Sequence, residues 1–555
     1  MTAANFCLTL FDTSGIQEYV FGSNRLKENV GASYLVGAAL DQWLEHACQE
    51  AVGGRVRWRR VADAPGGLVL PANTELDAEL IYAAGGNAAV LFRSREQAVR
   101  AVQHWSKRLL LDAPGLRVTV AHQEFAAGDL HGAWQRALEA LTVAKAGAPL
   151  RQPLEGLSLT RSCRSTGLAA AGWASSGAER DLDPNLSAPA RRAVQFLSPQ
   201  AACRLAAVDA ANDQLLGAFQ GVLKGEFTFT EDVEQLGQQE REHHLAVVHA
   251  DGNGLGKRFR EQLGPGEDDA VARRVRDFAR CIHIASQQAL RATLTALAGS
   301  HDSLRKKGMQ VHEMRHRFVL PCRPILYGGD DVTFVCHGKL GLSLAAVYLR
   351  RFAEGEASDG KPLSACAGVA IAHMRAPFSR VYELADDLCK EAKRWARADG
   401  EAGSSWLDAH LALEGPGEPL EQVRARRTVR LRDGTAEGAL DWRPWRVTPA
   451  HEDDRDWDSV AGWMRQLQQR DADGPLRWPA SVRRGLLDSL AAGPSASEAA
   501  IAHQRWRGRA LPEPRTASVD AGWCPRPTLG VKGASQATPY YDPLELVDYF
   551  WEVGE

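Results

Sequence analysis

The sequence predicts an α+β fold in which one arrangement of strands and helices occurs twice along the chain. Two apolar strands each end at an aspartate, and each is followed, 73 or 77 residues later, by a glycine pair within an apolar stretch. Between and after these strands lie segments with the hydrophobic period of helices. The segments between the two copies and after the second copy show mainly helical patterns as well.

The composition is that of a globular protein and excludes several function classes. Hydrophobic residues make up 45% of the 555-residue chain, and its net charge of -3 gives no global attraction to nucleic acid or to a membrane surface. No apolar run approaches the ~20 residues of a membrane span, and the N-terminal MTAANFCLTLF lacks the basic segment of a signal peptide. Ten cysteines without a C-x-x-C pair indicate reduced thiols. We therefore expect a cytoplasmic protein without a membrane partner.

The second copy has the clearer pattern. The apolar strand LAVVHA ends at Asp251, and RPILYGGDDVTFVC predicts two strands joined by a tight turn. Gly328 and Gly329 supply the positive φ angles that a tight hairpin turn requires. The other expected elements are a helix over 268–297, a helix from GLSLAAVYLRRFAEG, a strand over 363–374 and a helix over 378–397. The order β-α-β-β-α-β-α, with helices covering one face of an antiparallel sheet, is that of a ferredoxin-like palm domain.

The first copy repeats this order with fewer acids. Its strand ends at Asp12, its hairpin carries Gly85 and Gly86, and its last helix ends in VAKA, which matches EAKRW of the second copy. The other expected elements are a helical region after the first strand, a helix over 95–112 and a strand over 116–125. Landmarks in the same order at nearly the same intervals indicate a duplication. Because Asn87 stands where the second copy has Asp330, we expect one active palm and one degenerate palm.

Three acids of the second copy are candidate catalytic residues. A strand-end aspartate and a hairpin-turn aspartate lie side by side when their strands are neighbours, so Asp251, Asp330 and Asp331 should converge. Like charges at that range raise one another's pKa unless a cation compensates. Oxygen ligands suit Mg²⁺ or Mn²⁺, and two such ions held by aspartates promote nucleotidyl transfer. The alternative is a solvated turn with exposed acids, which the position of Asp251 at the end of its own strand disfavours.

The residues around these acids fit a nucleotide triphosphate. Gly328 and Gly329 allow phosphates to approach the backbone closely, and Lys393 on the following helix offers them a point charge. Asn253 and Gly254, two and three residues after the strand-end acid, complete the expected nucleotide-binding residues of this palm.

Five separated motifs resemble the large polymerase–cyclase subunit of type III CRISPR effector complexes. They lie in order within residues 1–148 and 244–400: FDTSGIQEYVFGSNRLKENVGASYLV, IYAAGGNAAVLF, HADGNGLGKRF, LYGGDDVTF and LSACAGVAIAHMRAPFSRVYELADDLCKEAKR. In that family two palms face each other with ATP between them, and the GGDD palm joins ATP into cyclic oligoadenylates that activate separate nucleases. The resemblance implies the same role in antiviral defence for this chain.

The resemblance also implies roles for individual residues and partners. The three acids become the ligands of two Mg²⁺ or Mn²⁺ ions, Gly328 and Gly329 line the triphosphate of ATP, and Lys393 contacts a phosphate. From the first palm, Ser14 and the stretch Gly31-Ala32-Ser33 are expected to face a second nucleotide. The implied partners are guide RNA and the small CRISPR effector subunits with target RNA.

Two family features differ in this sequence. Many members begin with a histidine-aspartate nuclease domain, whereas this sequence opens on palm sequence, and His301-Asp302 is a lone dipeptide. We therefore expect no cleavage of single-stranded DNA. The family often holds zinc between its palms, but TRSCRSTGLAAAG offers only Cys163, with Cys203 as one further ligand. Because zinc prefers four nitrogen or sulfur ligands, we expect no zinc site.

The remaining segments complete the expected domain organisation. Arginines between residues 424 and 432 beside the Asp433-Gly434 turn predict a basic hairpin, for which a solvated strand face is favoured over phosphate contact with RNA. Three helical patterns follow, and in the family such a bundle contacts the small subunits. The expected domains are the degenerate palm over 1–148, a helical linker over 149–243, the catalytic palm over 244–412, and a basic hairpin with a helical bundle over 413–555.

Three functions stay open on the sequence. The favoured one is a metal-dependent nucleotidyltransferase that makes cyclic oligoadenylates from ATP as the large subunit of an RNA-guided complex. An idle scaffold subunit of such a complex is the second, but a scaffold has no physical need for mutually repelling acids. The third is a standalone cyclic (di)nucleotide synthase. Its diguanylate cyclase form is disfavoured because those enzymes have one palm and pair as homodimers, whereas this chain carries both copies.

Overall fold

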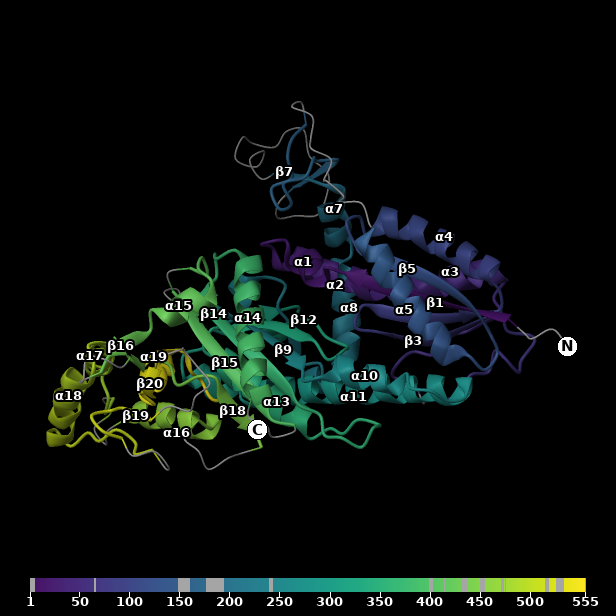
Figure 1. Cartoon of the computed structure of the whole chain (residues 1–555). Helices are drawn as coiled ribbons and strands as arrows, with labels where there is room; N and C mark the ends of the chain where they lie inside the picture. The colour runs from purple at the N-terminus through teal and green to yellow at the C-terminus, as the bar shows by residue number, and fades with distance from the viewer. Residues whose placement is uncertain are drawn as a thin grey trace, which may run out of the picture. The chain divides into compact units, whose positions relative to one another are not determined.

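The computed structural model divides into two compact units (Figure 1). The first unit takes Met1–Gln220, Gly254–Ile284 and Ala357–Asp359, and the second takes the rest of the chain. None of the helices among the described residues combines the length and apolar character needed to cross a membrane. The described residues are 5–63, 66–147, 160–175, 194–238, 243–398, 403–413, 415–431, 437–449, 455–470, 474, 476–514, 519–525 and 534–554.

The first unit contains the sheet of the first palm. The strands are β1 (Asn5–Ser14), β2 (Val56–Arg57), β3 (Ala78–Ala84), β4 (Asn87–Phe92) and β5 (Arg117–Ala126). Their order in the sheet is β2-β3-β4-β1-β5, and β1 is antiparallel to both of its neighbours. The last four strands in that order form the expected palm. The helical region expected after β1 is divided into α1 (Ile16–Phe21), α2 (Leu26–Leu40) and α3 (Gln42–Val52).

Helices cover both faces of this first sheet, which corrects the expectation of one covered face. Phe11 of β1 packs edge-on against Trp105 of α4 (Arg95–Asp112), with 5.2 Å between the ring centroids. Leu8 and Leu10 point to the opposite face, because side chains alternate along a strand. They share a buried cluster with Trp134 of α5 (Leu130–Ala146). The sheet is therefore the middle layer of three.

The second unit contains the larger sheet, which extends the expected palm. The strands are β9 (His244–Gly252), β12 (Cys322–Leu326), β13 (Val332–His337), β14 (Ala365–His373), β15 (Ser405–Ala412) and β18 (Trp445–Thr448). Their order is β12-β13-β9-β14-β15-β18. The first four form the palm predicted from the sequence. The parallel strand β15 and the antiparallel strand β18 were not predicted.

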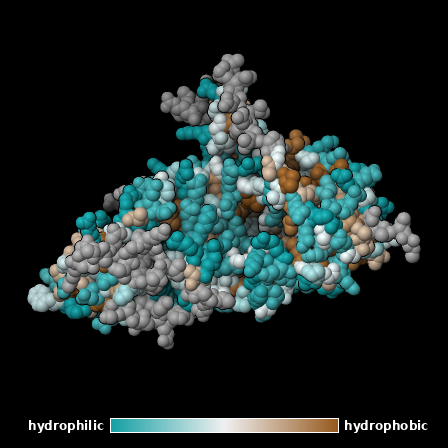
Figure 2. All heavy atoms as spheres, in the orientation of Figure 1, coloured by the Kyte–Doolittle hydropathy of each residue, from teal (hydrophilic) through white to brown (hydrophobic). Residues whose placement is uncertain are grey.

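Two glycines show that helices cover both faces of the second sheet as well (Figure 1). A Cβ on Gly341 of α13 (Gly341–Ala353) would lie 3.0 Å from the side chain of Val369. A Cβ on Gly368 would lie 2.0 Å from the carbonyl oxygen of Ala385 in α14 (Phe378–Ala398). Since Gly368 and Val369 are consecutive residues of β14, they point to opposite faces of the sheet. Helices α13 and α14 therefore cover opposite faces. Hydrophilic side chains dominate the visible surface over α14 (Figure 2), as expected of an amphipathic helix.

The long helix α11 (Asp268–Gly299) follows the strand-end acid of the second palm, as the sequence predicted, and runs from the first unit into the second. The short helix α10 (Leu255–Gln262) precedes it.

The linker region is only partly helical. It forms α7 (Pro199–Ala206), α8 (Val208–Ala218) and α9 (Gln220–Leu223), but also an unpredicted pair of strands, β6 (Gly172–Ser175) and β7 (Val194–Leu197). Cys163 lies in a small apolar cluster with Ala201. Next to it the hydroxyl oxygens of Thr166 and Ser198 lie 2.9 Å apart.

The C-terminal part contains the predicted hairpin and helices. Strands β16 (Thr428–Arg430) and β17 (Glu437–Ala439) pair in antiparallel fashion, while Arg432 and the Asp433-Gly434 turn lie outside the described residues. The helices are α15 (Leu420–Ala425), α16 (Trp457–Leu467), α17 (Ala480–Ala491), α18 (Pro494–Trp506) and α19 (Tyr541–Leu546).

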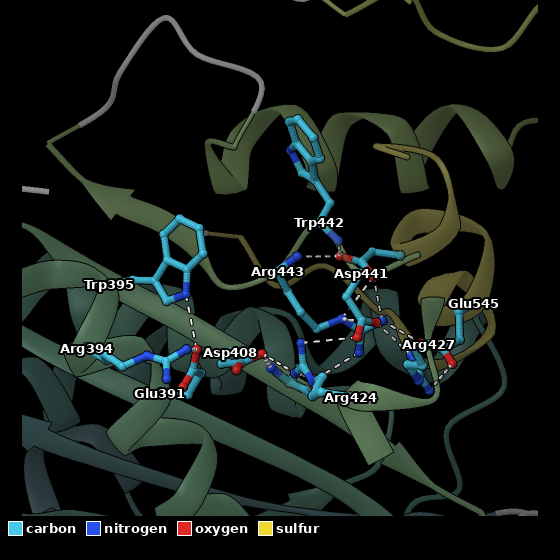
Figure 3. A network of polar contacts seen from close by, with 12 residues as sticks. Glu391, Arg394, Trp395, Asp408, Arg424, Arg427, Asp441, Trp442, Arg443 and Glu545 are labelled. Carbon is cyan, nitrogen blue, oxygen red and sulfur yellow. Dashed lines mark hydrogen bonds and ion pairs between the residues drawn. The ribbon is translucent and has the colours of Figure 1, made fainter. Parts of the chain in front are cut away.

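Two arginines that precede this hairpin form partly buried ion pairs (Figure 3). Arg424 lies 2.7 Å from Asp408 of β15, and Arg427 lies 2.7 Å from Glu545 of α19. Buried Arg443 lies 2.5 Å from the same glutamate. The favoured solvated strand face is therefore wrong for Arg424 and Arg427, whose charges are matched by carboxylates of the protein, while phosphate contact stays a prediction. The network joins the added strand β15 of the second sheet to the C-terminal helix α19.

Candidate active site

The strand register brings the three predicted acids to one edge of the second sheet. Asp251 lies near the end of β9, which is hydrogen-bonded to β13 on one side and to β14 on the other. Val332 of β13 pairs with Ala250 of β9, so Asp331 follows next to Asp251. Asp330 is the residue before it, in the loop between β12 and β13. The sequence prediction that these carboxylates lie together is therefore consistent with the register.

The loop that carries two of the acids is longer than the tight turn predicted. It spans the five residues from Tyr327 to Asp331, and of its two glycines only Gly328 has a positive φ, of 121°. The pairing of β12 with β13 shifts register between Pro324 and Leu326, and this irregularity ends the ladder early. In the first palm the tight turn is correct, because Gly85 and Gly86 alone connect β3 to β4, with φ of 59° and 79°.

The acids and one lysine perturb one another electrostatically. Burial, together with the charges of Asp251 and Asp331, raises the pKa of Asp330 to about 6. Lys393 of α14 lies with its Nζ 2.5 Å from Asp251 Oδ2 and donates to the carbonyl oxygen of Gly252 at 3.0 Å. Burial opposes the charge on Lys393, but the Asp251 carboxylate outweighs it and raises the lysine's pKa. A protonated lysine thus balances one of three clustered carboxylates.

His249, with its polar partners Thr333 and Asp386, supports the turn and was missed by the sequence reasoning. The buried ring of His249 has its Nδ1 3.2 Å from Asp331 Oδ1 and 3.1 Å from Thr333 Oγ1. Its Nε2 lies 3.6 Å from Asp386 Oδ1 on α14. Burial alone would lower the pKa of His249, but the carboxylates of Asp331, Asp386 and Asp251 raise it. The available signal was spacing: His249 precedes Asp251 by two residues in β9, so both side chains leave the same face.

The first palm keeps half of this arrangement. Lys145 Nζ lies 2.6 Å from Asp12 Oδ1, as Lys393 lies against Asp251 in the second palm. Gly15 and Gly254, each three residues after its acid, precede helices α1 and α10 with φ of 66° and 67°. These matching contacts and angles agree with the duplication inferred from spacing. Asn87 pairs with Asp12 in the register, so only one acid remains at this edge.

The residues of the second palm that were predicted to contact a nucleotide have different structural surroundings. The amide nitrogen of Asn253 donates to Ser364 Oγ at 3.1 Å and to the Ser404 carbonyl oxygen at 3.0 Å. These bonds commit the amide nitrogen of Asn253 to holding the loop after β9, while its predicted nucleotide contact stays a prediction. Gly254 is explained by its left-handed backbone. Gly328, Gly329 and Lys393 lie around the acids, as a triphosphate site would require. Their contacts with the phosphates stay predictions.

The residues predicted to serve a second nucleotide divide into two groups. A Cβ on Gly31 of α2 would lie 1.7 Å from the carbonyl oxygen of Arg204, so Gly31 is required for the packing of α7 on α2. Ala32 is fully buried. Neither can face a nucleotide, which corrects that part of the stretch. Ser14 and Ser33 are partly exposed, and their role stays a prediction.

The donor set suits a divalent cation, although it is not arranged as a closed metal site. Among the described residues no three His, Cys, Asp or Glu side chains already surround one point as metal ligands. Instead, Asp251 forms an ion pair with Lys393, and Asp331 lies against His249. Asp251 and Asp331 remain 38% and 37% exposed, and the raised pKa of Asp330 marks a charge excess that a cation would relieve. The oxygen-only chemistry fits Mg²⁺ or Mn²⁺.

Comparison with known proteins identifies this sheet. Residues 244–400 match the family model of the Cas10/Cmr2 second palm domain. This segment is similar to the second palm domain of Cas10/Cmr2 proteins. The resemblance drawn from the five motifs is thereby confirmed for the palm that carries the GGDD loop. None of the curated proteins matches the chain.

Solved structures extend the similarity beyond the Cas10/Cmr2 palm. A chain of the crystal structure of a Csm1–Csm4 cassette in complex with cA4 is 14% identical, with a TM-score of 0.50, over 99% of this chain and 70% of that one. The AMPPNP complex has a TM-score of 0.48 at 14% identity and covers 99% and 70%. The cA3 complex has 0.45 at 14% and covers 88% and 62%. The cA4 complex shows a shared fold, and the present chain spans 62% to 70% of the length of these matches.

Proposed function

We propose that this chain is a metal-dependent nucleotidyltransferase that converts ATP into cyclic oligoadenylates as the large subunit of a type III CRISPR complex. The observation that carries the proposal is the set of three acids with Lys393 at the edge of a Cas10/Cmr2 second palm. The similar Csm1–Csm4 cassettes were crystallised with cA4, cA3 and AMPPNP, which supports an adenine nucleotide as substrate. Guide RNA and small effector subunits with target RNA are the partners we propose for the complex.

The chain's own residues account for binding and charge balance at this site. Asp251, Asp330 and Asp331 would hold the divalent cations, which supply activation of the attacking hydroxyl and neutralisation of the leaving pyrophosphate. Lys393 stays protonated beside Asp251 and offers its charge to triphosphate oxygens at the same strand end. The loop with Gly328 brings the backbone close to that position, and His249 fixes the orientation of Asp331.

The idle scaffold is disfavoured by a comparison within the chain. Asp330 sits where burial and two neighbouring carboxylates oppose its ionisation, so it weakens the fold at neutral pH. In the first palm Asn87 pairs with Asp12, the register position that Asp331 has beside Asp251, so an uncharged amide stands there in place of an acid. A scaffold would gain stability at neutral pH from an uncharged amide in place of Asp330. Retention of the acid supports a chemical role.

The experiment that tests the proposal measures pyrophosphate release from labelled ATP and labelled GTP with Mg²⁺ or Mn²⁺. It uses the purified chain alone and the chain with partner subunits and target RNA. We expect release from ATP in at least one of these conditions, and loss of that release in Asp330→Ala and Asp331→Ala. Absence of release in every condition would support the idle scaffold, and preference for GTP would support a diguanylate cyclase.

A further inference from the structure

A small sheet in the second unit presents basic residues at one end. Its strands β8 (Phe227–Phe229), β10 (Glu313–Met314) and β11 (Arg317–Leu320) lie in the order β10-β11-β8. Arg315 and His316 form the two-residue turn between β10 and β11. Strand β8 is parallel to β11, with Phe227 beside Phe318, so Lys224 lies at the same end as that turn. We call Lys224, Arg315, His316 and Arg317 the basic sheet end.

The backbone at the basic sheet end is strained. Among the described residues, four that are not glycine have a positive φ, and three of them are Lys224, Arg315 and His316, at 45°, 51° and 61°. Two-residue turns with both φ angles positive favour Asn-Gly, because other side chains crowd the backbone there. Strain of this kind persists where the side chains are needed, so it points to a function for these basic residues.

The charges at the basic sheet end are not neutralised by the protein. Lys224, Arg315 and Arg317 are exposed, and none of them takes part in an ion pair within the part of the chain that the structure describes. The nearby acids Glu226 and Glu313 are exposed and equally unpaired there. Helix α12 (His301–Lys306) packs on this sheet through His301, which contacts the rings of Phe227 and Phe318. The end of α12 and the residue after it add three exposed cations, Arg305, Lys306 and Lys307.

We propose that the basic sheet end binds the phosphodiester backbone of a single-stranded nucleic acid. The six cations Lys224, Arg305, Lys306, Lys307, Arg315 and Arg317 outnumber the three acids Glu226, Asp302 and Glu313 in this region. On a chain with net charge -3, this local excess of positive charge suits a polyanion. Unpaired arginines on a rigid turn favour phosphate, whose oxygens they bind through two parallel hydrogen bonds. The end is three strands wide, about 10 Å, which matches one strand better than a duplex. This site is separate from the proposed nucleotidyl transfer and does not depend on it.

The test separates the side chains from the fold. In Arg315→Asn with His316→Gly, the turn receives the residues it prefers, so the melting temperature should stay equal or rise while a cation is lost. Lys224→Asn removes a second cation, and asparagine tolerates the left-handed backbone at this position. The three substitutions together make the triple variant. Fluorescence anisotropy with labelled single-stranded RNA and single-stranded DNA of the same sequence, across a range of salt, gives affinity and salt dependence. Arg484→Gln, an 81% exposed arginine on α17, is the control.

We expect the wild type to bind a single strand, with a slope of log K against log salt that becomes shallower by roughly 1.4 in the triple variant and stays unchanged in the control. Preference for the RNA or the DNA strand then distinguishes the two sources of the same phosphate chemistry. The proposal is overturned if the triple variant, folded as well as wild type, keeps the wild-type affinity and slope, or if wild type binds neither strand at about 50 mM salt. Binding to poly-glutamate as tight as to either strand would assign the surface to an acidic protein instead.

Discussion

Replacing Asp330 by asparagine should stabilise the protein in the absence of divalent cations. The pKa of Asp330 is about 6 in the folded chain, about two above that of a solvated aspartate. A carboxyl whose pKa is raised by folding contributes stability below its unfolded pKa and loses it as pH rises through the folded value. A folded pKa about two above the unfolded pKa lowers the free energy of unfolding by about 3 kcal/mol at about pH 8. At about pH 4 the loss is less than about 1 kcal/mol. Asparagine has the same shape and no charge to desolvate.

The assay is thermal denaturation of wild type and Asp330→Asn in a chelator, at about pH 4 and about pH 8. A gain of about 2–3 kcal/mol from this linkage corresponds to a rise of a few degrees in Tm for a unit of this size. Asp488→Asn, at a 73% exposed position on α17, should change Tm little at either pH. Equal Tm values for wild type and Asp330→Asn at pH 8, or a gain as large at pH 4, would refute the electrostatic account of this acid.

Three further substitutions probe the surroundings of the site. Lys393→Met should lower product formation at least about tenfold, because it removes the cation beside Asp251, and a pH–rate profile shifted to higher pH would distinguish this from unfolding. His249→Gln should weaken Mn²⁺ binding about tenfold, measured by titration calorimetry, because Asp331 loses its partner, while unchanged Mn²⁺ affinity would contradict that role. Asp542→Asn should destabilise the protein by about 3–5 kcal/mol, seen as a lower Tm, because buried Arg443 loses a carboxylate at 2.7 Å.

Sequence reasoning succeeded where local patterns determine the structure. The strand that ends at Asp251, the helix over 268–297 and the helix over 378–397 all lie where periodicity placed them, since each has a long apolar repeat. The duplication was visible because strand ends, glycines and lysines recur at matched intervals. The contacts Asp12–Lys145 and Asp251–Lys393 show that these landmarks are neighbours in space within each palm.

The missed features depend on partners far away in the sequence. Asn253 looked free for a nucleotide because Ser364 and Ser404, which accept from its amide, are more than a hundred residues distant. The covering of both sheet faces follows from the close approach of α14 to Gly368, which no local pattern reveals. His249 was overlooked because a histidine inside an apolar strand gives no sign of the carboxylates that will meet it. Tertiary neighbours, rather than local preference, decide each of these cases.

The central claim is that the acids at the edge of the second palm join ATP into cyclic oligoadenylates. Mass spectrometry of the products formed from ATP and Mn²⁺ by the chain with its partner subunits and target RNA tests it most directly. Wild type and Asp387→Asn, altered at a half-exposed aspartate on α14, should both yield cyclic oligoadenylates, whereas Asp331→Asn should yield none. Cyclic products from Asp331→Asn at the wild-type level, or their absence from wild type, would contradict the account.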